Sequence, residues 1–496
     1  MKQDARKVVI VGAGIAGLSA AVYAQKCGYQ AEVIEMNDIA GGLAMSWRRG
    51  DYTFETCLHW LYGSNPKSPM HAQWQEIFDI EKLDFVDPEI FACLEAPDGR
   101  SLTIYADTDR LEAELLAKAP EDAEEIHQLV HGIRRLKNFK LPDPGANWVS
   151  RCHTMLGDAP GLPLVRSLSK ISSGEYGQRF KNPLLRAFFG EGEMAELSAL
   201  ALVFSLAWMG ARDAGYAIGG SQAIIQLIQQ NLAQLGGRIR FGARVQRILT
   251  RNGTAVGVLL ASGEEIEADW VISAADGHTT LFNLLGGRYT SDAVNKIYGE
   301  WKTFPSFLQV SLGLALDLKG QPPLLTRLLD RPVTVDPGTE LHQLSFRFFH
   351  YDPTFAPPGK TAVTCFLPTR NFDYWIKLRA SDLNAYRAEK QRVANAVIGE
   401  LEHRLPRLRG AMDTVDVSTP ASVVRFTGNW KGSMEGWMLT PSTGFRQLPN
   451  TVPGLSRFMM IGQWVAPGGG LPSGPMTARP AVQAMCKEDG LHFAVR

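Results

Sequence analysis

The sequence has little cysteine, no excess of charge of either sign and no long hydrophobic run, and each absence excludes a class of protein. Six of the 496 residues are cysteines, and none shows the spacing of a metal or redox motif, so we expect free thiols and no metal site. Lys and Arg total 51, as do Asp and Glu, so no basic field is available for nucleic acid. The longest weakly polar run, 197–211, is shorter than the roughly 20 residues that cross a bilayer.

Targeting signals are also missing from the sequence. The opening residues, MKQDARKVVIVG, run into a strand pattern without a signal-peptide core, and no lipidation motif is present. We therefore expect a cytoplasmic protein, with 197–211 as a candidate helix for peripheral membrane contact and hydrophobic core as the alternative explanation of that run. With 45% hydrophobic and 21% charged residues, the chain can bury a large core, and its length suggests two or three domains.

Three separated stretches have the pattern of one nucleotide-binding domain. The run 8–12 predicts a buried parallel strand, followed by a helix over about 15–27 and a second strand at 30–35, which is half of a doubly wound, Rossmann-type α/β unit. The stretch 238–276 predicts a small antiparallel meander that ends in an apolar strand returning to the sheet. The run 457–462 predicts one more buried strand.

Two insertions separate these stretches. The first, from about 90 to 215, looks helical and includes an Asp or Thr cap candidate. The second, from about 286 to 440, alternates with period two and contains one charged helix at about 381–405. Its predicted strands are FLQVSLGLAL (307–316), LHQLSFRFFH (341–350) and KTAVTCFLPT (360–369).

The expected fold class is therefore α/β: a doubly wound dinucleotide-binding domain with a β-meander, plus an inserted α+β domain with a mixed antiparallel sheet. We assign to the first domain residues 1–90, 215–285 and 441–496. We assign to the second, as the substrate-binding domain, residues 91–214 and 286–440, with 120–214 mostly helical.

The loop GAGIAG places Gly12, Gly14 and Gly17 in the GxGxxG arrangement after the first strand. The first glycine permits the tight turn, the second a close backbone approach to pyrophosphate, and the third close packing of helix on strand. The helix N-terminus then offers unpaired N–H groups to the anion. Glu35, about 20 residues further on, is placed to accept hydrogen bonds from a ribose diol.

A second glycine pair distinguishes FAD from NAD as the dinucleotide. Gly41 and Gly42 follow Glu35 in the run IAGGLAMSW, and an NAD domain has no need of them. A longer flavin dinucleotide does need them, because a second close backbone approach lets the chain pass the cofactor toward its flavin end. We therefore predict FAD as the cofactor.

These motifs resemble those of the FAD-dependent amine oxidase and carotenoid desaturase superfamily. Its second dinucleotide signature is GGR followed by Ser or Thr; Ser46 fits, whereas Leu43 stands in place of the usual Arg. The resemblance covers nearly the whole chain, in the phytoene desaturase, carotenoid isomerase and retinol saturase branch. Its further landmarks are 54–63, 216–232, 418–437 and 461–474.

The resemblance implies a set of FAD-contacting residues. Gln463 occupies the place of the family's acidic residue after Gly462, so it brings a hydrogen-bonding amide without charge. The full expected set is Gly12, Gly14, Ile15, Ala16, Gly17, Glu35, Met36, Gly41, Gly42, Leu43, Ala44, Leu58, His59, Trp60, Val245, Ala275, Gly462, Gln463, Gly470, Leu471, Pro472 and Met476.

His59 is the candidate catalytic residue, because the resemblance places it beside the flavin ring. Its functional interpretation is a proton donor or hydrogen-bond partner to flavin or substrate. The alternative is a packed histidine between Leu58 and Trp60. We find no nucleophile–base set that would supply another mechanism.

The resemblance implies an FAD-dependent oxidoreductase that acts on C–C or C=C bonds of a hydrophobic polyene, isoprenoid or acyl substrate. Hydride would pass between a substrate carbon and flavin N5, giving desaturation, saturation or isomerisation. Two alternatives share the architecture: a flavin amine oxidase, and a non-catalytic lipid-escort protein. The expected partner is a hydrophobic small molecule, and the sequence leaves the oligomeric state open.

Overall fold

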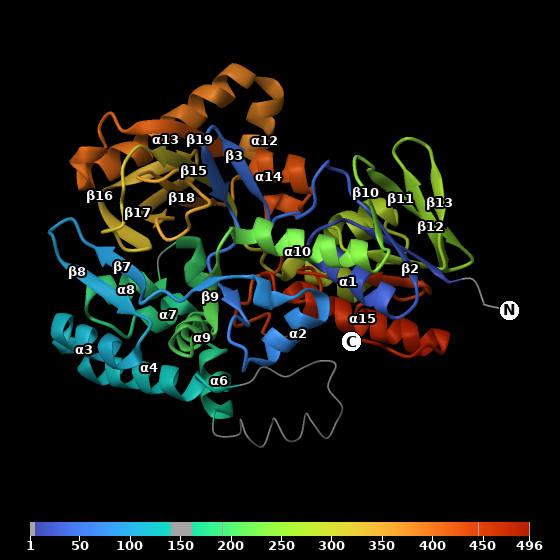
Figure 1. The fold of residues 1–496 in the computed structure, drawn as a ribbon. Coiled ribbons are helices and arrows are strands. Elements are labelled where there is room, and N and C mark those ends of the chain that lie inside the picture. The colour runs from blue at the N-terminus through green and yellow to red at the C-terminus, as the bar shows by residue number, and fades with distance from the viewer. Residues whose placement is uncertain (1–4, 140–160, 191, 445, 496) are drawn as a thin grey trace.

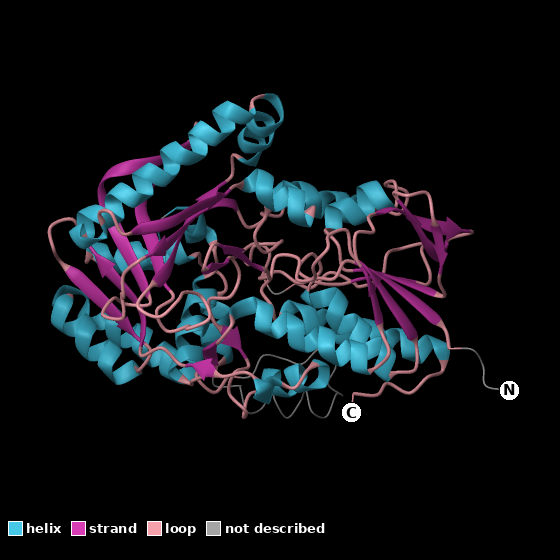
Figure 2. Cartoon of the chain, turned by 45° about the horizontal axis from the view of Figure 1, so that its top comes forward, coloured by secondary structure: helices cyan, strands magenta, loops and turns pink. Residues whose placement is uncertain are grey.

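The computed structural model describes residues 5–139, 161–190, 192–444 and 446–495. A parallel sheet lies at one end of the molecule and a larger mixed sheet at the other, with helices packed around both (Figures 1 and 2). This arrangement confirms the predicted fold class of an α/β unit combined with an α+β unit.

The parallel sheet has five strands in the order β10-β2-β1-β14-β20, and every neighbouring pair is parallel. Its strands come from the three stretches expected to form one domain: β1 (Lys7–Val11), β2 (Gln30–Ile34), β10 (Arg238–Arg240), β14 (Trp270–Ser273) and β20 (Phe458–Met460). Residues 238–240 were expected in the meander; they pair instead with β2, because β2 would otherwise be an open edge beside Glu35.

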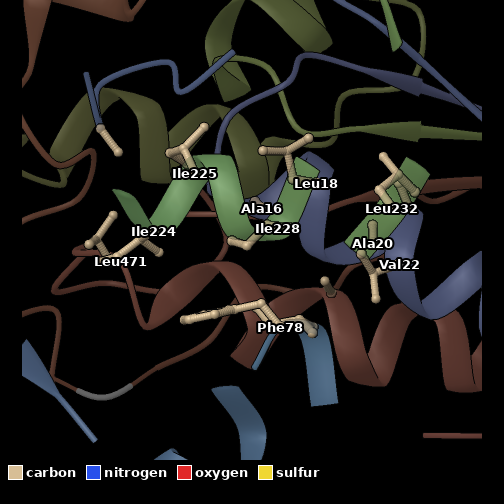
Figure 3. Close-up of a cluster of buried hydrophobic side chains, with 14 of the residues drawn as sticks. Ala16, Leu18, Ala20, Val22, Phe78, Ile224, Ile225, Ile228, Leu232 and Leu471 are labelled. Atoms are coloured by element: carbon tan, nitrogen blue, oxygen red, sulfur yellow. The ribbon is translucent and has the colours of Figure 1, made fainter. Parts of the chain in front are cut away.

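The two faces of the parallel sheet pack against different partners. Along β1, Val8 and Ile10 belong to the core under the helices, whereas Val9 and Val11 belong to the core under the meander. The helical side consists of α1 (Ile15–Lys26), α10 (Gly220–Gln234) and α15 (Ser473–Asp489). Figure 3 shows the side chains of α10 lying against those of α1. The opposite side carries β11 (Val245–Arg251), β12 (Thr254–Leu260) and β13 (Glu265–Glu267).

The mixed sheet has seven strands in the order β19-β15-β18-β17-β16-β7-β8. Its pairs are antiparallel except β16 with β7, which is parallel. The strands are β7 (Ile90–Glu95), β8 (Ser101–Tyr105), β15 (Ser306–Leu314), β16 (Leu324–Asp336), β17 (Thr339–Phe348), β18 (Thr361–Thr369) and β19 (Met412–Ser418). Three helices accompany it: α12 (Phe372–Ser381), α13 (Leu383–Arg404) and α14 (Pro420–Thr427).

The first insertion begins with strands rather than the helix expected from residue 90. β7 and β8 pair across the turn at Asp98 and Gly99 at one edge of the mixed sheet, and their buried side chains alternate, so they bury one face against the helices of the insertion. The helices of this insertion are α3 (Thr108–Lys118), α4 (Ala123–Leu136), α6 (Leu162–Leu168), α7 (Ser173–Gly177), α8 (Pro183–Gly190) and α9 (Ala199–Gly210). Asp107 caps α3 by accepting hydrogen bonds from the N–H groups of Asp109 and Arg110.

Helix α9 corresponds to the run 197–211 that was a candidate for membrane contact. None of its residues is exposed, and Leu200, Val203 and Phe204 belong to the core of the insertion. Packing of these buried side chains accounts for much of the apolar run, while Leu202 and Trp208 are only partly buried. Within the part of the chain that the structure describes, no helix combines the length and hydropathy needed to span a membrane.

Short elements connect the two ends of the molecule. Strands β3 and β4 form a hairpin that leads toward His59, and β9 pairs with both β5 and β6. The remaining bounds are β3 (Ser46–Arg49), β4 (Tyr52–Glu55), β5 (Leu61–Tyr62), β6 (Phe85–Val86), β9 (Ala214–Ala217), α2 (Pro69–Ile77) and α11 (Asp292–Glu300).

Candidate functional site

The glycine-rich loop between β1 and α1 has the geometry of an anion site. Gly12 adopts φ +97°, in the left-handed region that favours glycine. A Cβ on Gly17 would lie 1.9 Å from the carbonyl oxygen of Gly12, so only glycine lets α1 pack this close to β1. No side chain caps α1 at Gly14, which leaves the first N–H groups of the helix free for a diphosphate.

The second glycine pair lies directly against this loop. The Gly41 N–H donates to the Ala13 carbonyl at 2.9 Å, and a Cβ on Gly42 would lie 3.3 Å from Gly14 Cα. Both residues have positive φ, +132° and +63°. The two loops thus provide adjacent stretches of bare backbone, as a cofactor longer than a single nucleotide requires.

Glu35 closes the outer end of the loop. Its side-chain carboxylate is buried and accepts hydrogen bonds from the Ala13 N–H at 2.8 Å and from the Asn37 N–H and Nδ2 at 2.9 Å each. A carboxylate offers about four acceptor positions, so one remains for a ribose hydroxyl. The free acceptor position of Glu35 therefore fits the ribose at the adenosine end of a dinucleotide.

A continuous groove runs from Glu35 past the GxGxxG loop and the pair Gly41-Gly42 to the loop before α15. Gln463 lines it, and its Nε2 lies 3.5 Å from Asn429 Oδ1. Most of the predicted cofactor residues line this groove: Gly12, Gly14, Ile15, Ala16, Glu35, Met36, Gly41, Gly42, Leu43, Ala44, Val245, Ala275, Gly462, Gln463, Gly470 and Leu471.

Six predicted cofactor residues do not line the groove. Leu58 is buried in the core, and Trp60 packs on Trp208 with ring centroids 5.8 Å apart. Gly17 faces β1, as its packing role requires. The last three are His59, which lines a second cavity, and Pro472 and Met476 at the start of α15.

The second cavity has a volume of about 420 Å³ and lies beside the groove. The aromatic rings of Phe307 and Phe366 stack in its wall with centroids 4.2 Å apart. The lining is Leu43, Thr56, Cys57, His59, Gly190, Met194, Phe307, Glu340, Leu341, His342, Gln343, Ser345, Phe366, Pro368, Met434 and Glu435. Four of these residues also line the groove: Leu43, Cys57, Met434 and Glu435. The cavity and the groove therefore adjoin at these four residues.

His59 projects into this cavity, so it is not packed between its neighbours in the chain. Its side chain is accessible from the cavity although the protein encloses it. Burial, with a smaller contribution from the Arg347 guanidinium, lowers the pKa of His59 well below its ordinary value. The imidazole is therefore neutral near pH 7, which suits a hydrogen-bond partner better than a cationic acid.

Glu55 orients the segment that carries Cys57 and His59. One carboxylate oxygen accepts from the Cys57 N–H at 2.9 Å, the Leu58 N–H at 3.1 Å and the Ser221 hydroxyl at 2.7 Å. The other accepts from the Ser221 N–H at 2.9 Å and the Ser46 hydroxyl at 2.8 Å. This single buried side chain joins β4 to the start of α10 and positions the cavity wall.

Glu435 is the residue that sequence reasoning missed. It lies in the run GSMEG (432–436), where a single acid follows an apolar residue between two glycines. That pattern was the available signal. Burial raises the pKa of Glu435 to about 7. Burial, and then the carboxylates of Glu55 and Glu435, also raise the pKa of the Cys57 thiol well above its ordinary value, so Cys57 remains a thiol.

Known proteins with similar sequences cover almost the whole chain. The lycopene-forming phytoene desaturase of Paracoccus sp. is 25% identical over 98% of this chain and 98% of that protein. The chloroplastic prolycopene isomerase of Arabidopsis thaliana is 24% identical over 93% of this chain and 80% of that protein.

Solved structures show the same fold. An oxidoreductase from Methanosarcina mazei aligns with TM-score 0.61 and 16% identity, covering 96% of this chain and 100% of that one. Cyclohexylamine oxidase from Brevibacterium oxydans aligns with TM-score 0.58 and 14% identity, covering 98% of this chain and 100% of that one. The model of the flavin-containing amine oxidoreductase family matches residues 15–486. The chain therefore belongs to the flavin-containing amine oxidoreductases, and it is an FAD-dependent oxidoreductase.

Proposed function

We propose that this enzyme acts on C–C or C=C bonds of a hydrophobic polyene or related isoprenoid by exchanging hydride with one of the bonded carbons. The substrate is held in the cavity of about 420 Å³. The observation that carries the proposal is the shared wall, in which Leu43, Cys57, Met434 and Glu435 border both the groove and the cavity. The relatives named above as phytoene desaturase and prolycopene isomerase support the substrate class.

The groove residues are proposed to hold FAD along its length. The N–H groups at the start of α1 would bind the diphosphate, and Glu35 the adenosine ribose. The bare backbone of Gly41 and Gly42 would pass the ribityl chain toward the shared wall. In this assignment residues 1–90, 215–285 and 441–496 bind FAD, and residues 91–214 and 286–440 supply most of the substrate cavity.

The cavity residues are proposed to orient the substrate. The bound flavin supplies the hydride exchange itself. Phe307 and Phe366 offer stacked aromatic faces to a conjugated chain and exclude water from it. His59, neutral in this environment, is proposed to hold the substrate or the flavin edge through a hydrogen bond.

Anaerobic mixing of the holoenzyme with phytoene or prolycopene in detergent micelles tests the proposal. We expect the polyene absorbance to shift. Desaturation is expected to shift it to the red, and isomerisation is expected to shift it while the mass of the polyene stays the same. Desaturation is also expected to bleach the flavin. Bleaching by primary amines, with no change in any polyene, would instead establish amine oxidation.

Ser345→Trp supplies a variant that fills the cavity and leaves the groove intact, because Ser345 lines only the cavity. It is expected to retain bound flavin and to lose the polyene reaction. Ser262→Trp, at an exposed turn of the meander, is the matched control and is expected to behave as wild type. Polyene turnover by Ser345→Trp at the wild-type rate would place the substrate elsewhere.

A further inference from the structure

The Glu435 side chain lies at the junction of the groove and the cavity, and no described residue is paired with it. Glu435 lines both spaces. Among the described residues, no hydrogen bond or ion pair to this carboxyl is found, whereas the buried carboxylates of Glu35 and Glu55 accept three and five hydrogen bonds. The Glu435 side chain is partly buried, and an acid without a partner in such a site is expensive to keep charged, which points to a role in the reaction.

The backbone that carries Glu435 is held on both sides. The Ser433 hydroxyl bonds to both the N–H and the carbonyl of Gly436 at 3.1 Å, and the Gly436 carbonyl also accepts from the Phe304 N–H at 2.8 Å. A Cβ on Gly469 would lie 2.6 Å from Glu435 Cβ, so that glycine makes room for the acid. Glu435 therefore borders the cavity from a fixed turn, as preorganised catalysis requires.

The groups around Glu435 do not supply a fixed positive charge. Cys57 and His59 face the junction from the segment after β4, and Asp276 faces the groove from the end of β14. Glu340 and His342 of β17 line the same cavity. Among the described lining residues of both spaces, the one Lys or Arg is Arg244, at the adenosine end beside Val245. Burial without a cation raises the pKa of Glu435 to about 7, so both protonation states are accessible near neutral pH.

We propose that Glu435 is the acid–base catalyst that exchanges a proton with the substrate carbon next to the one that exchanges hydride. This inference builds on the proposed function above. In desaturation, one C–H bond breaks with its electron pair leaving as hydride to the oxidised flavin. The neighbouring C–H bond breaks as Glu435 takes the proton, and its electron pair becomes the new C=C π bond. The substrate is oxidised by two electrons, the flavin is reduced by two, and the carboxylate becomes a carboxylic acid.

The isosteric variant Glu435→Gln tests this role in the holoenzyme. It is expected to bind flavin normally and to slow anaerobic flavin reduction by the polyene about 10²–10⁴-fold, as for loss of a general base. The wild-type rate is expected to rise with pH through about 7, and this inflection is expected to vanish in Glu435→Gln. Glu435→Asp, which keeps a carboxyl, should retain a pH inflection at a reduced rate.

Infrared difference spectroscopy gives a readout that needs no turnover. A carboxylic-acid C=O band that titrates near neutral pH in the wild-type holoenzyme is expected to be absent from Glu435→Gln. It is expected to persist in Glu300→Gln, a control at an exposed position on α11. Equal flavin reduction by wild type and Glu435→Gln would overturn the inference and leave the proposed function standing. A wild-type flavin that no polyene reduces or uses would overturn both.

Discussion

Replacing Glu55 by glutamine tests how much the protein depends on one buried carboxylate to assemble its cavity wall. The carboxylate of Glu55 accepts five hydrogen bonds, and three of its donors are backbone N–H groups, which cannot reverse their role. The amide of glutamine has one acceptor oxygen and one NH₂ group. In either orientation, that NH₂ group faces at least one of the backbone N–H groups of Cys57, Leu58 and Ser221.

The magnitude follows from this loss. A buried N–H left unpaired costs about 1–3 kcal/mol, and the remaining bonds weaken roughly twofold when the acceptor loses its charge. Relief from burying a charge offsets part of this cost. We therefore expect Glu55→Gln to lower the free energy of unfolding by about 3 kcal/mol, which is large for a change of one atom.

Urea unfolding followed by tryptophan fluorescence measures the effect, with flavin release recorded in parallel. Glu89→Gln applies the same chemical change to an exposed acid and is expected to change stability by less than about 0.5 kcal/mol. Flavin release is expected at a lower urea concentration in Glu55→Gln, because the affected segment borders the groove. If Glu55→Gln and Glu89→Gln unfold at the same urea concentration, the assigned role of Glu55 is refuted.

Two further predictions concern packing and pH. Gly17→Ala places a Cβ 1.9 Å from the Gly12 carbonyl oxygen and is expected to yield protein without bound FAD by absorbance; Gly299→Ala, where nothing lies within 4 Å, should bind FAD fully. Asp489 is buried, and burial by itself would raise its pKa, but hydrogen bonds from Arg457, Trp270, Tyr29 and Arg6 lower it overall. Its stabilising contribution is thus present above the unfolded pKa of about 3.9 and is lost as pH falls through the folded value. The stability difference between wild type and Asp489→Asn should shrink between about pH 5 and pH 3, and a constant difference would contradict this.

Local patterns were enough to predict the glycine-rich loops that form the groove. The GxGxxG spacing and the pair Gly41-Gly42 encode backbone conformations that only glycine adopts easily, and the structure shows those positive φ angles at Gly12, Gly41 and Gly42. Strands β1, β14 and β20 of the parallel sheet were equally readable, because their apolar runs are buried.

Patterns that depend on distant partners were read less well. Residues 90–105 are short amphipathic strands that gain their stability from β16, and nothing local identifies that partner. The run 197–211 is strongly apolar because its buried side chains pack in the core of the insertion. Hydropathy alone does not distinguish such a buried helix from one that meets lipid.

The sequence by itself determined that this chain folds around a flavin dinucleotide, since the glycine spacings and buried strands that require it are local properties of the backbone. Only the tertiary structure decided which acid faces the reaction. Glu435 and Cys57 are far apart along the chain, yet they share one wall because the segment after β4 and the turn after α14 converge at the end of the groove. Enclosure by both segments sets the protonation of Glu435, and enclosure exists only in the folded chain.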